Sequence, residues 1–164
     1  MTSRSSIIDA TKLTSRKVEQ FHQYWRGKCA NGVLPSRAAI DPTEIPRFLR
    51  HLVLAEIEPE PMRIRYRLVG TGVVEVDGFD YTNRYLDECN FAVEPLLLQC
   101  YRRLIATHAP VFAYYEWSKS DWRRPGAVGV SETGFFPLSN DGATIDFAIS
   151  IADSTIRPYP LDAI

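Results

Sequence analysis

A β-hairpin that can be read directly from the residues restricts the fold of this chain more than any other feature. Two strand-like segments, His51–Glu58 and Arg63–Gly70, flank a loop at 59–62 that contains two prolines. Proline suits turns and cannot donate to a sheet ladder, so the loop separates the two strands. We therefore expect a sheet built at least in part from antiparallel strands.

The charged and the apolar residues of the two segments agree on one register. The pairs expected in it are Glu58 with Arg63, Glu56 with Arg65, and Leu54 with Arg67. Opposite charges in facing positions stabilise an antiparallel ladder. The other face of the hairpin then carries Val53, Ala55, Ile57, Ile64, Tyr66 and Leu68. This apolar face is expected to lie against a core.

An amphipathic helix is predicted ahead of the hairpin, within Leu13–Cys29. Its apolar residues Val18, Phe21 and Trp25 recur at steps of three and four, which places them on one stripe. A stripe of large apolar side chains has to be buried against something. The candidates are the chain's own sheet and a second copy of the chain.

The two candidates lead to different roles for the helix. Leu52 and Leu54 leave the second face of the hairpin only partly polar, so Phe21 and Trp25 are expected to cover it. In the alternative, the stripe stays exposed, and Val18, Phe21 and Trp25 form the interface of a homodimer.

The remaining residues are expected to add two helices and three strands. The helices are Thr71–Asp77, ended by Gly78, and residues 91–108; the strands are Val111–Trp117, Val128–Leu138 and Thr144–Ile151. Strands that alternate with helices in this order predict an α+β fold. Its sheet is antiparallel and five-stranded, with helices over one face and an N-terminal flanking helix.

Length and composition favour one domain in a reducing compartment. The 164 residues carry a net charge of −1, which lacks the positive excess typical of nucleic-acid-binding proteins. No apolar run is long enough to span a membrane, and three cysteines at unrelated spacings form no disulfide framework. We expect a cytoplasmic protein with a flexible leader at 1–11, a single domain at 12–153 and a tail at 154–164.

Several stretches of the chain resemble a known family. They are LPSRAAIDPTEIPR (34–47), RYRLVGT (65–71), DYTNRYLDE (80–88) and FPLS (136–139), followed by Asp141-Gly142. In this order they are similar to small bacterial single-domain proteins with a PAS fold, over most of the chain. The resemblance implies a five-stranded antiparallel sheet whose helices enclose a ligand cavity, used for sensing or protein contacts. It carries over no catalytic residue.

Motifs of other function classes fail on their spacing. The segment Gly70-Thr71-Gly72 lacks the other residues of a phosphate-binding loop and fits a strand-to-helix corner. His22, His51 and His108 have no second ligand at metal-binding spacing, and His108 before Ala-Pro suits a helix cap better than a haem ligand. Cys89 lacks the neighbours of a flavin-binding photoreceptor motif. No catalytic or metal site is predicted, and any cofactor stays unknown.

Aromatic residues supply the candidate walls of a ligand cavity. The expected lining residues on inward strand positions are Tyr66, Leu68, Tyr115, Trp117, Phe136 and Phe147. They predict a space for a small, partly apolar ligand, and the alternative is a core that the same rings fill. The segment Trp122-Arg123-Arg124 is a candidate anion clamp, with a solvated loop as the simpler interpretation.

Three functions are compatible with these observations. The favoured one is a non-enzymatic sensory or regulatory module that binds a small ligand or a protein signalling partner. The second is a dimerisation or interaction module with a vestigial cavity. The third is a small isomerase-like enzyme, which would need a buried acid in the cavity. The nearest candidate acid, Asp146, lies on the strand face away from Phe147.

Overall fold

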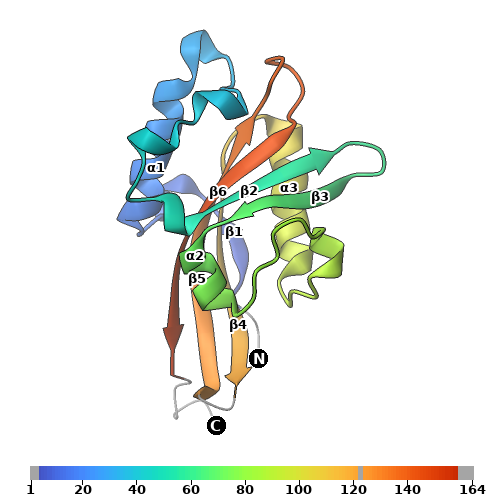
Figure 1. The fold of residues 1–164 in the computed structure, drawn as a ribbon. Helices are drawn as coiled ribbons and strands as arrows, with labels where there is room; N and C mark the ends of the chain where they lie inside the picture. The colour runs from blue at the N-terminus through green and yellow to red at the C-terminus, as the bar shows by residue number, and fades with distance from the viewer. Residues whose placement is uncertain (1–3, 122–123, 159–164) are drawn as a thin grey trace.

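The computed structural model describes residues 4–121 and 124–158. These residues form one antiparallel sheet of six strands in the order β1-β4-β5-β6-β2-β3 (Figure 1). The strands are β1 (Ser6–Ile8), β2 (Leu52–Glu58), β3 (Arg63–Val69), β4 (Val111–Asp121), β5 (Arg124–Leu138) and β6 (Phe147–Arg157). The α-helices of this part are α1 (Arg16–Lys28), α2 (Thr71–Asp77) and α3 (Glu94–Thr107). The predicted α+β fold with an antiparallel sheet is confirmed, with one strand more than expected.

The additional strand lies in the segment for which the sequence predicts a flexible leader. Residues Ser6–Ile8 pair with the edge strand β4, with Ile8 opposite Phe112. An extended segment that pairs with an open sheet edge satisfies the backbone groups of both. Three residues are too few for a periodic pattern, so the sequence does not reveal this strand. At the other end, β6 continues to Arg157, and residues 159–164 lie outside the described part.

Next to its loop, the β2–β3 hairpin has the predicted register. Glu58 faces Arg63, and Glu56 faces Arg65. Ile57, between the two glutamates, points into the core that also contains α3. Charge pairing and burial therefore specify the same alignment of the two strands.

A β-bulge changes the register further from the loop. Arg67 is the extra residue, so that Leu54 faces Leu68 instead of Arg67. One extra residue moves the side chains that follow it to the opposite face of the sheet. Leu68 therefore leaves the face predicted for it and is 48% exposed. The Arg67 guanidinium donates a hydrogen bond to the Glu56 carboxylate beside the bulge.

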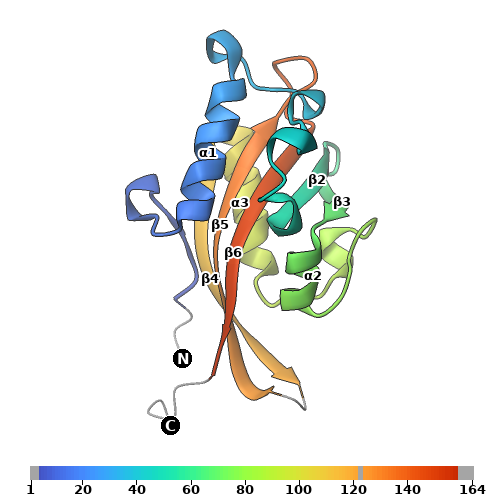
Figure 2. The same cartoon turned by 60° about the vertical axis from the view of Figure 1, so that its left-hand side comes forward.

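Helix α1 packs its apolar stripe on one face of the chain's own sheet (Figure 2). Val18 and Phe21 are fully buried, and Trp25 is 6% exposed. All three belong to one cluster with Leu52 and Leu54 of β2. The prediction that the helix covers this hairpin face is confirmed. The homodimer interface proposed for Val18, Phe21 and Trp25 is contradicted, because the chain already buries these side chains.

Two carboxylates of the central strands anchor the start of α1. Ser15 caps the helix by accepting a hydrogen bond from the Val18 N–H at 3.1 Å. The same hydroxyl donates to the Asp153 carboxylate of β6 at 2.6 Å. On β5, the Glu132 carboxylate accepts from the backbone N–H groups of Thr14 at 2.8 Å and Ser15 at 2.7 Å. The first turn of α1 is thereby attached directly to the sheet.

A glycine forms the corner between β3 and α2. The Gly70 N–H donates to the Leu52 carbonyl at 2.8 Å, which draws the two backbones together. A Cβ at Gly70 would lie 2.4 Å from the Arg50 carbonyl oxygen, so no other residue fits without a shift of the backbone. Helix α2 ends at Gly78, which has a left-handed backbone with φ of 91°. The predicted strand-to-helix corner is confirmed.

Helix α3 lies over the sheet face opposite α1 (Figure 2). It ends at His108, whose backbone is left-handed and whose N–H donates to the Leu104 carbonyl at 3.0 Å. His108 is therefore a helix cap, as predicted. Asn83 in the segment before α3 also has a positive φ, of 68°. Asn tolerates this left-handed conformation better than most other residues.

Candidate functional site

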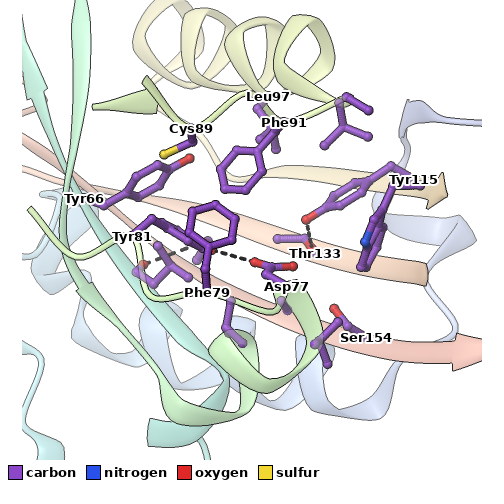
Figure 3. A pocket seen from close by; sticks show the side chains of 18 of the residues that line it. Tyr66, Asp77, Phe79, Tyr81, Cys89, Phe91, Leu97, Tyr115, Thr133 and Ser154 are labelled. Atoms are coloured by element: carbon purple, nitrogen blue, oxygen red, sulfur yellow. Dashed lines mark hydrogen bonds between the residues drawn. The ribbon is translucent and has the colours of Figure 1, made fainter. Parts of the chain in front are cut away.

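A cavity of about 270 Å³ lies on the sheet face opposite α1. Strands β4, β5 and β6 form its floor, and its walls come from β3, α2, α3 and the connecting segment 79–93 (Figure 3). Domain interiors are packed almost without voids larger than a water molecule. The cavity is lined by residues of the core that contains α3, and none of the buried residues of the α1 core line it.

A cluster of aromatic rings forms one wall of the cavity. It consists of Tyr66 on β3 and Phe79, Tyr81 and Phe91 in the connecting segment. The ring centroids of Tyr66 and Tyr81 lie 4.7 Å apart, and those of Tyr81 and Phe91 lie 5.0 Å apart, both in edge-to-face geometry. Such contacts stabilise the segment against the sheet in the absence of regular secondary structure.

Hydroxyl groups follow the floor of the cavity across three neighbouring strands. The Tyr115 hydroxyl on β4 lies 3.1 Å from Thr133 Oγ1 on β5. Thr133 Oγ1 lies 2.8 Å from Ser131 Oγ, which accepts a hydrogen bond from Ser154 Oγ on β6 at 2.9 Å. Each hydroxyl can donate and accept. The chain of hydroxyls can therefore reorient toward a donor or an acceptor, with Tyr115, Thr133 and Ser154 at the cavity.

Asp77 and Cys89 add two ionisable groups to the lining. Asp77 ends α2, and its carboxylate accepts a hydrogen bond from the Tyr81 hydroxyl at 3.0 Å. The Cys89 thiol is buried beside the aromatic wall, and burial raises its pKa to about 11. At neutral pH this thiol is protonated and therefore a poor nucleophile and a poor metal ligand.

Three of the six predicted lining residues reach this cavity. They are Tyr66, Tyr115 and Trp117. Trp117 lies against Gly129 of β5, where a Cβ would come within 2.2 Å of the indole ring. The Tyr115 and Trp117 rings are neighbours, with centroids 5.8 Å apart. Alternate positions of β4 thus carry aromatic rings into the cavity, as predicted.

Leu68, Phe136 and Phe147 do not line the cavity. Leu68 is turned away by the bulge in β3. Phe136 packs on α1 with its ring centroid 5.3 Å from that of Phe21, and Phe147 lies on the same face under the Arg37 guanidinium. Strand β5 turns Phe136 toward α1 and Phe135 toward the cavity, whereas β6 turns Phe147, Ile149 and Ile151 toward α1. The small residues between them face the cavity, which is why space remains there.

Sequence reasoning missed the lining residues outside the strands. Phe79, Tyr81 and Phe91 lie in a connector without periodicity, so nothing in the pattern indicates where they point. The only available signal was the number of aromatic residues, four within the thirteen positions 79–91 when Tyr85 is included. Asp77 was also missed, because the end of a short helix does not reveal its neighbours.

The other predicted candidates form no second site. Asp146 accepts a hydrogen bond from the Asn140 N–H at 2.8 Å in the turn before β6 and does not line the cavity. Trp122 and Arg123 of the candidate anion clamp lie outside the described residues. Within residues 4–121 and 124–158, no group of three His, Cys, Asp or Glu side chains could hold a metal ion. No helix in this part is both long and apolar enough to cross a membrane.

The buried tyrosines predict a loss of stability at alkaline pH. Burial raises the pKa of Tyr66 and Tyr101 well above the ordinary value, and the pKa of Tyr115 to about 12. Above pH 10 the unfolded chain releases phenol protons that the folded protein keeps, so stability falls as pH rises. For Tyr115 the loss is up to about 1.4 kcal/mol per pH unit between its two pKa values.

Urea denaturation at pH 8 and at pH 11, with phenolate absorbance recorded during an alkaline titration, measures this effect. We expect lower stability at pH 11 and a group of phenols that ionise only as the protein unfolds. Ionisation of all tyrosines near pH 10 in the folded protein would contradict the burial described above.

Comparison with known families gives one match. The sequence model of the family described as "PAS domain" matches residues 13–119, from the residues before α1 to β4. This stretch includes α1, the hairpin, the aromatic wall of the cavity and α3. No curated protein matches the chain.

Proposed function

We propose that this chain, which belongs to the PAS domain family, is a non-enzymatic sensory or regulatory module. In this proposal a small molecule binds in the cavity between the sheet, α2 and α3. Its binding changes the contacts that the domain makes with a protein signalling partner. Members of the family are sensory or regulatory modules. The bound small molecule and the protein signalling partner are part of our proposal.

The observation that carries the proposal is an unfilled space with polar groups on its floor. The cavity has a volume of about 270 Å³, near the lower end of small-molecule sites, which measure roughly 300–1,000 Å³. Aromatic walls with a few hydrogen-bonding groups are typical of such sites.

The proposal also covers the cellular compartment of the protein and its oligomeric state. The three cysteines are free thiols, which supports a reducing compartment, and we propose that the protein is cytoplasmic. A homodimer would have to use a surface other than the stripe of α1, because that stripe is buried. This burial removes the argument for a pure dimerisation module.

A variant that fills the cavity tests the proposal. Ala152 on β6 lines the cavity and is 9% exposed, so Ala152→Leu places additional carbon atoms in it. Thermal unfolding with a panel of cellular metabolites should identify a ligand for the wild-type protein. At a concentration of 100 Kd, that ligand stabilises the folded state by about 2.7 kcal/mol. We expect Ala152→Leu to abolish this stabilisation.

The matched control is Leu68→Ser on the opposite sheet face, where the side chain is largely exposed. It should retain the full ligand effect. Native mass spectrometry of the same three proteins reports the stoichiometry, expected to be one to one. Absence of any ligand and of any captured protein partner would refute the proposal, as would equal ligand binding by wild type and Ala152→Leu.

A further inference from the structure

We infer that the ligand is a flat aromatic compound of one or two fused rings that carries no negative charge and has a hydrogen-bonding group on one edge. This inference rests on the proposed function and specifies the chemical class that the cavity accepts. Three features of the lining carry it: the position of the aromatic rings, the chain of hydroxyls, and the charges.

The aromatic rings flank the cavity from two sides. Figure 3 shows Phe91 and Tyr81 on one side, Tyr115 on the other, and Thr133 between them. The first flank is held by the edge-to-face contact of Tyr81 and Phe91, and the second by the contact of Tyr115 with Trp117. A flat ring that enters between the flanks meets aromatic surface on both sides, in the offset or edge-to-face geometry that such rings prefer.

The hydroxyl chain provides the polar contact at the edge of that ring. Thr133 is 2% exposed, and its hydroxyl is positioned by Tyr115 and Ser131. A ligand hydroxyl, carbonyl or ring N–H can join the chain as donor or acceptor, because the hydroxyls rotate. A ring without such a group would leave the hydroxyls only the hydrogen bonds that they already make with one another.

The charges of the described lining residues disfavour an anion. Among the described residues that line the cavity there is no Lys, Arg or His, and Asp77 supplies a carboxylate. An anion would lose its hydration without gaining a cationic partner among these described lining residues, and the faces of the aromatic walls are themselves electron-rich. The cavity therefore favours a neutral ring over a carboxylate, a sulfonate or a phosphate.

The size of the cavity limits the number of rings. Its volume of about 270 Å³ accommodates one or two fused rings, whereas drug-sized ligands occupy sites of up to roughly 1,000 Å³. Large macrocycles and dinucleotides are therefore outside the class.

Calorimetric titration with probes that share one ring system tests the three features separately. The probes are 2-naphthol, naphthalene, 2-naphthoate and 2-naphthylmethylammonium, which are neutral and polar, neutral and apolar, anionic, and cationic at pH 7. We expect 2-naphthol to bind wild type at least about tenfold more tightly than naphthalene, because its hydroxyl adds one hydrogen bond worth about 1.4 kcal/mol. The anionic probe, 2-naphthoate, should bind at least about tenfold more weakly than 2-naphthol and more weakly than the cationic probe of the same ring system.

The variant Thr133→Val keeps the shape of the side chain and removes its hydroxyl. The variant should weaken the binding of 2-naphthol about tenfold, and it should leave the affinity for naphthalene within about twofold of the wild-type value. Comparison of two probes on the same variant separates the lost hydrogen bond from any change in folding. Equal weakening of 2-naphthol and naphthalene by Thr133→Val, or binding of 2-naphthoate to the wild type as tight as that of 2-naphthol, would overturn the inference.

The experiment separates this inference from the proposed function. If an anionic or non-aromatic metabolite binds wild type and fails to bind Ala152→Leu, the ligand class inferred here is wrong and the sensory function stands. If no naphthalene probe and no metabolite binds, and no protein partner is captured, both are wrong.

Discussion

The Phe21→Ala variant is expected to lower the free energy of unfolding by about 3–5 kcal/mol, the usual cost of removing a buried phenylalanine. Phe21 is fully buried between α1 and the sheet. Its ring lies 5.3 Å from that of Phe136 and 5.7 Å from that of Phe48, measured between centroids. Urea denaturation followed by circular dichroism measures the loss.

Val33→Ala is the control, because Val33 is 52% exposed and its truncation should change stability by no more than about 0.5 kcal/mol. Gel filtration of both variants should give the elution volume of the wild type. Loss of less than about 1 kcal/mol in Phe21→Ala, or conversion of a dimer to a monomer, would show that α1 packs on a partner.

Two glycine-to-alanine substitutions should change stability in opposite directions. In Gly70→Ala, the new Cβ would lie 2.4 Å from the Arg50 carbonyl oxygen and 2.7 Å from that of Leu49. Both atoms belong to the backbone and cannot rotate away. Overpacking usually lowers the free energy of unfolding by about 1–3 kcal/mol, and we expect a loss at or above the upper end of this range. In Gly27→Ala, the Cβ would have no neighbour within 4 Å.

Gly27 lies within α1, where alanine is favoured over glycine by roughly 0.5–1 kcal/mol. Gly27→Ala should therefore raise the unfolding midpoint, and Gly70→Ala should lower it strongly. Measurement of both midpoints in the same denaturant tests the geometry of the β3–α2 corner. A Gly70→Ala protein with wild-type stability would contradict the close approach of the two backbones.

The sequence predicted the hairpin well where two independent signals agreed. Near the loop, charge pairs such as Glu56 with Arg65 and the buried apolar face required the same alignment. The bulge at Arg67 could not be predicted, because an extra residue leaves no mark in an alternating pattern that ends two residues later. That single insertion turned Leu68 from an expected lining residue into an exposed one.

The site was predicted only in part, since alternation in a strand does not say which face meets which helix. For β6, the alternation grouped Phe147 with the residues of one face, and this face packs on α1. The cavity lies on the other face, above small side chains such as Ser150 and Ala152. On β6, the bulky residues therefore marked the filled core, and the small residues marked the space. The same limitation hid Phe91, whose position depends on packing and not on periodicity.

The most direct test of the account is a calorimetric titration of wild type and Ala152→Leu with the strongest ligand found for the wild type. The account predicts one-to-one binding by the wild type, and binding at least tenfold weaker by a folded Ala152→Leu protein. Equal affinity of the two proteins would place the ligand outside the cavity and contradict the account.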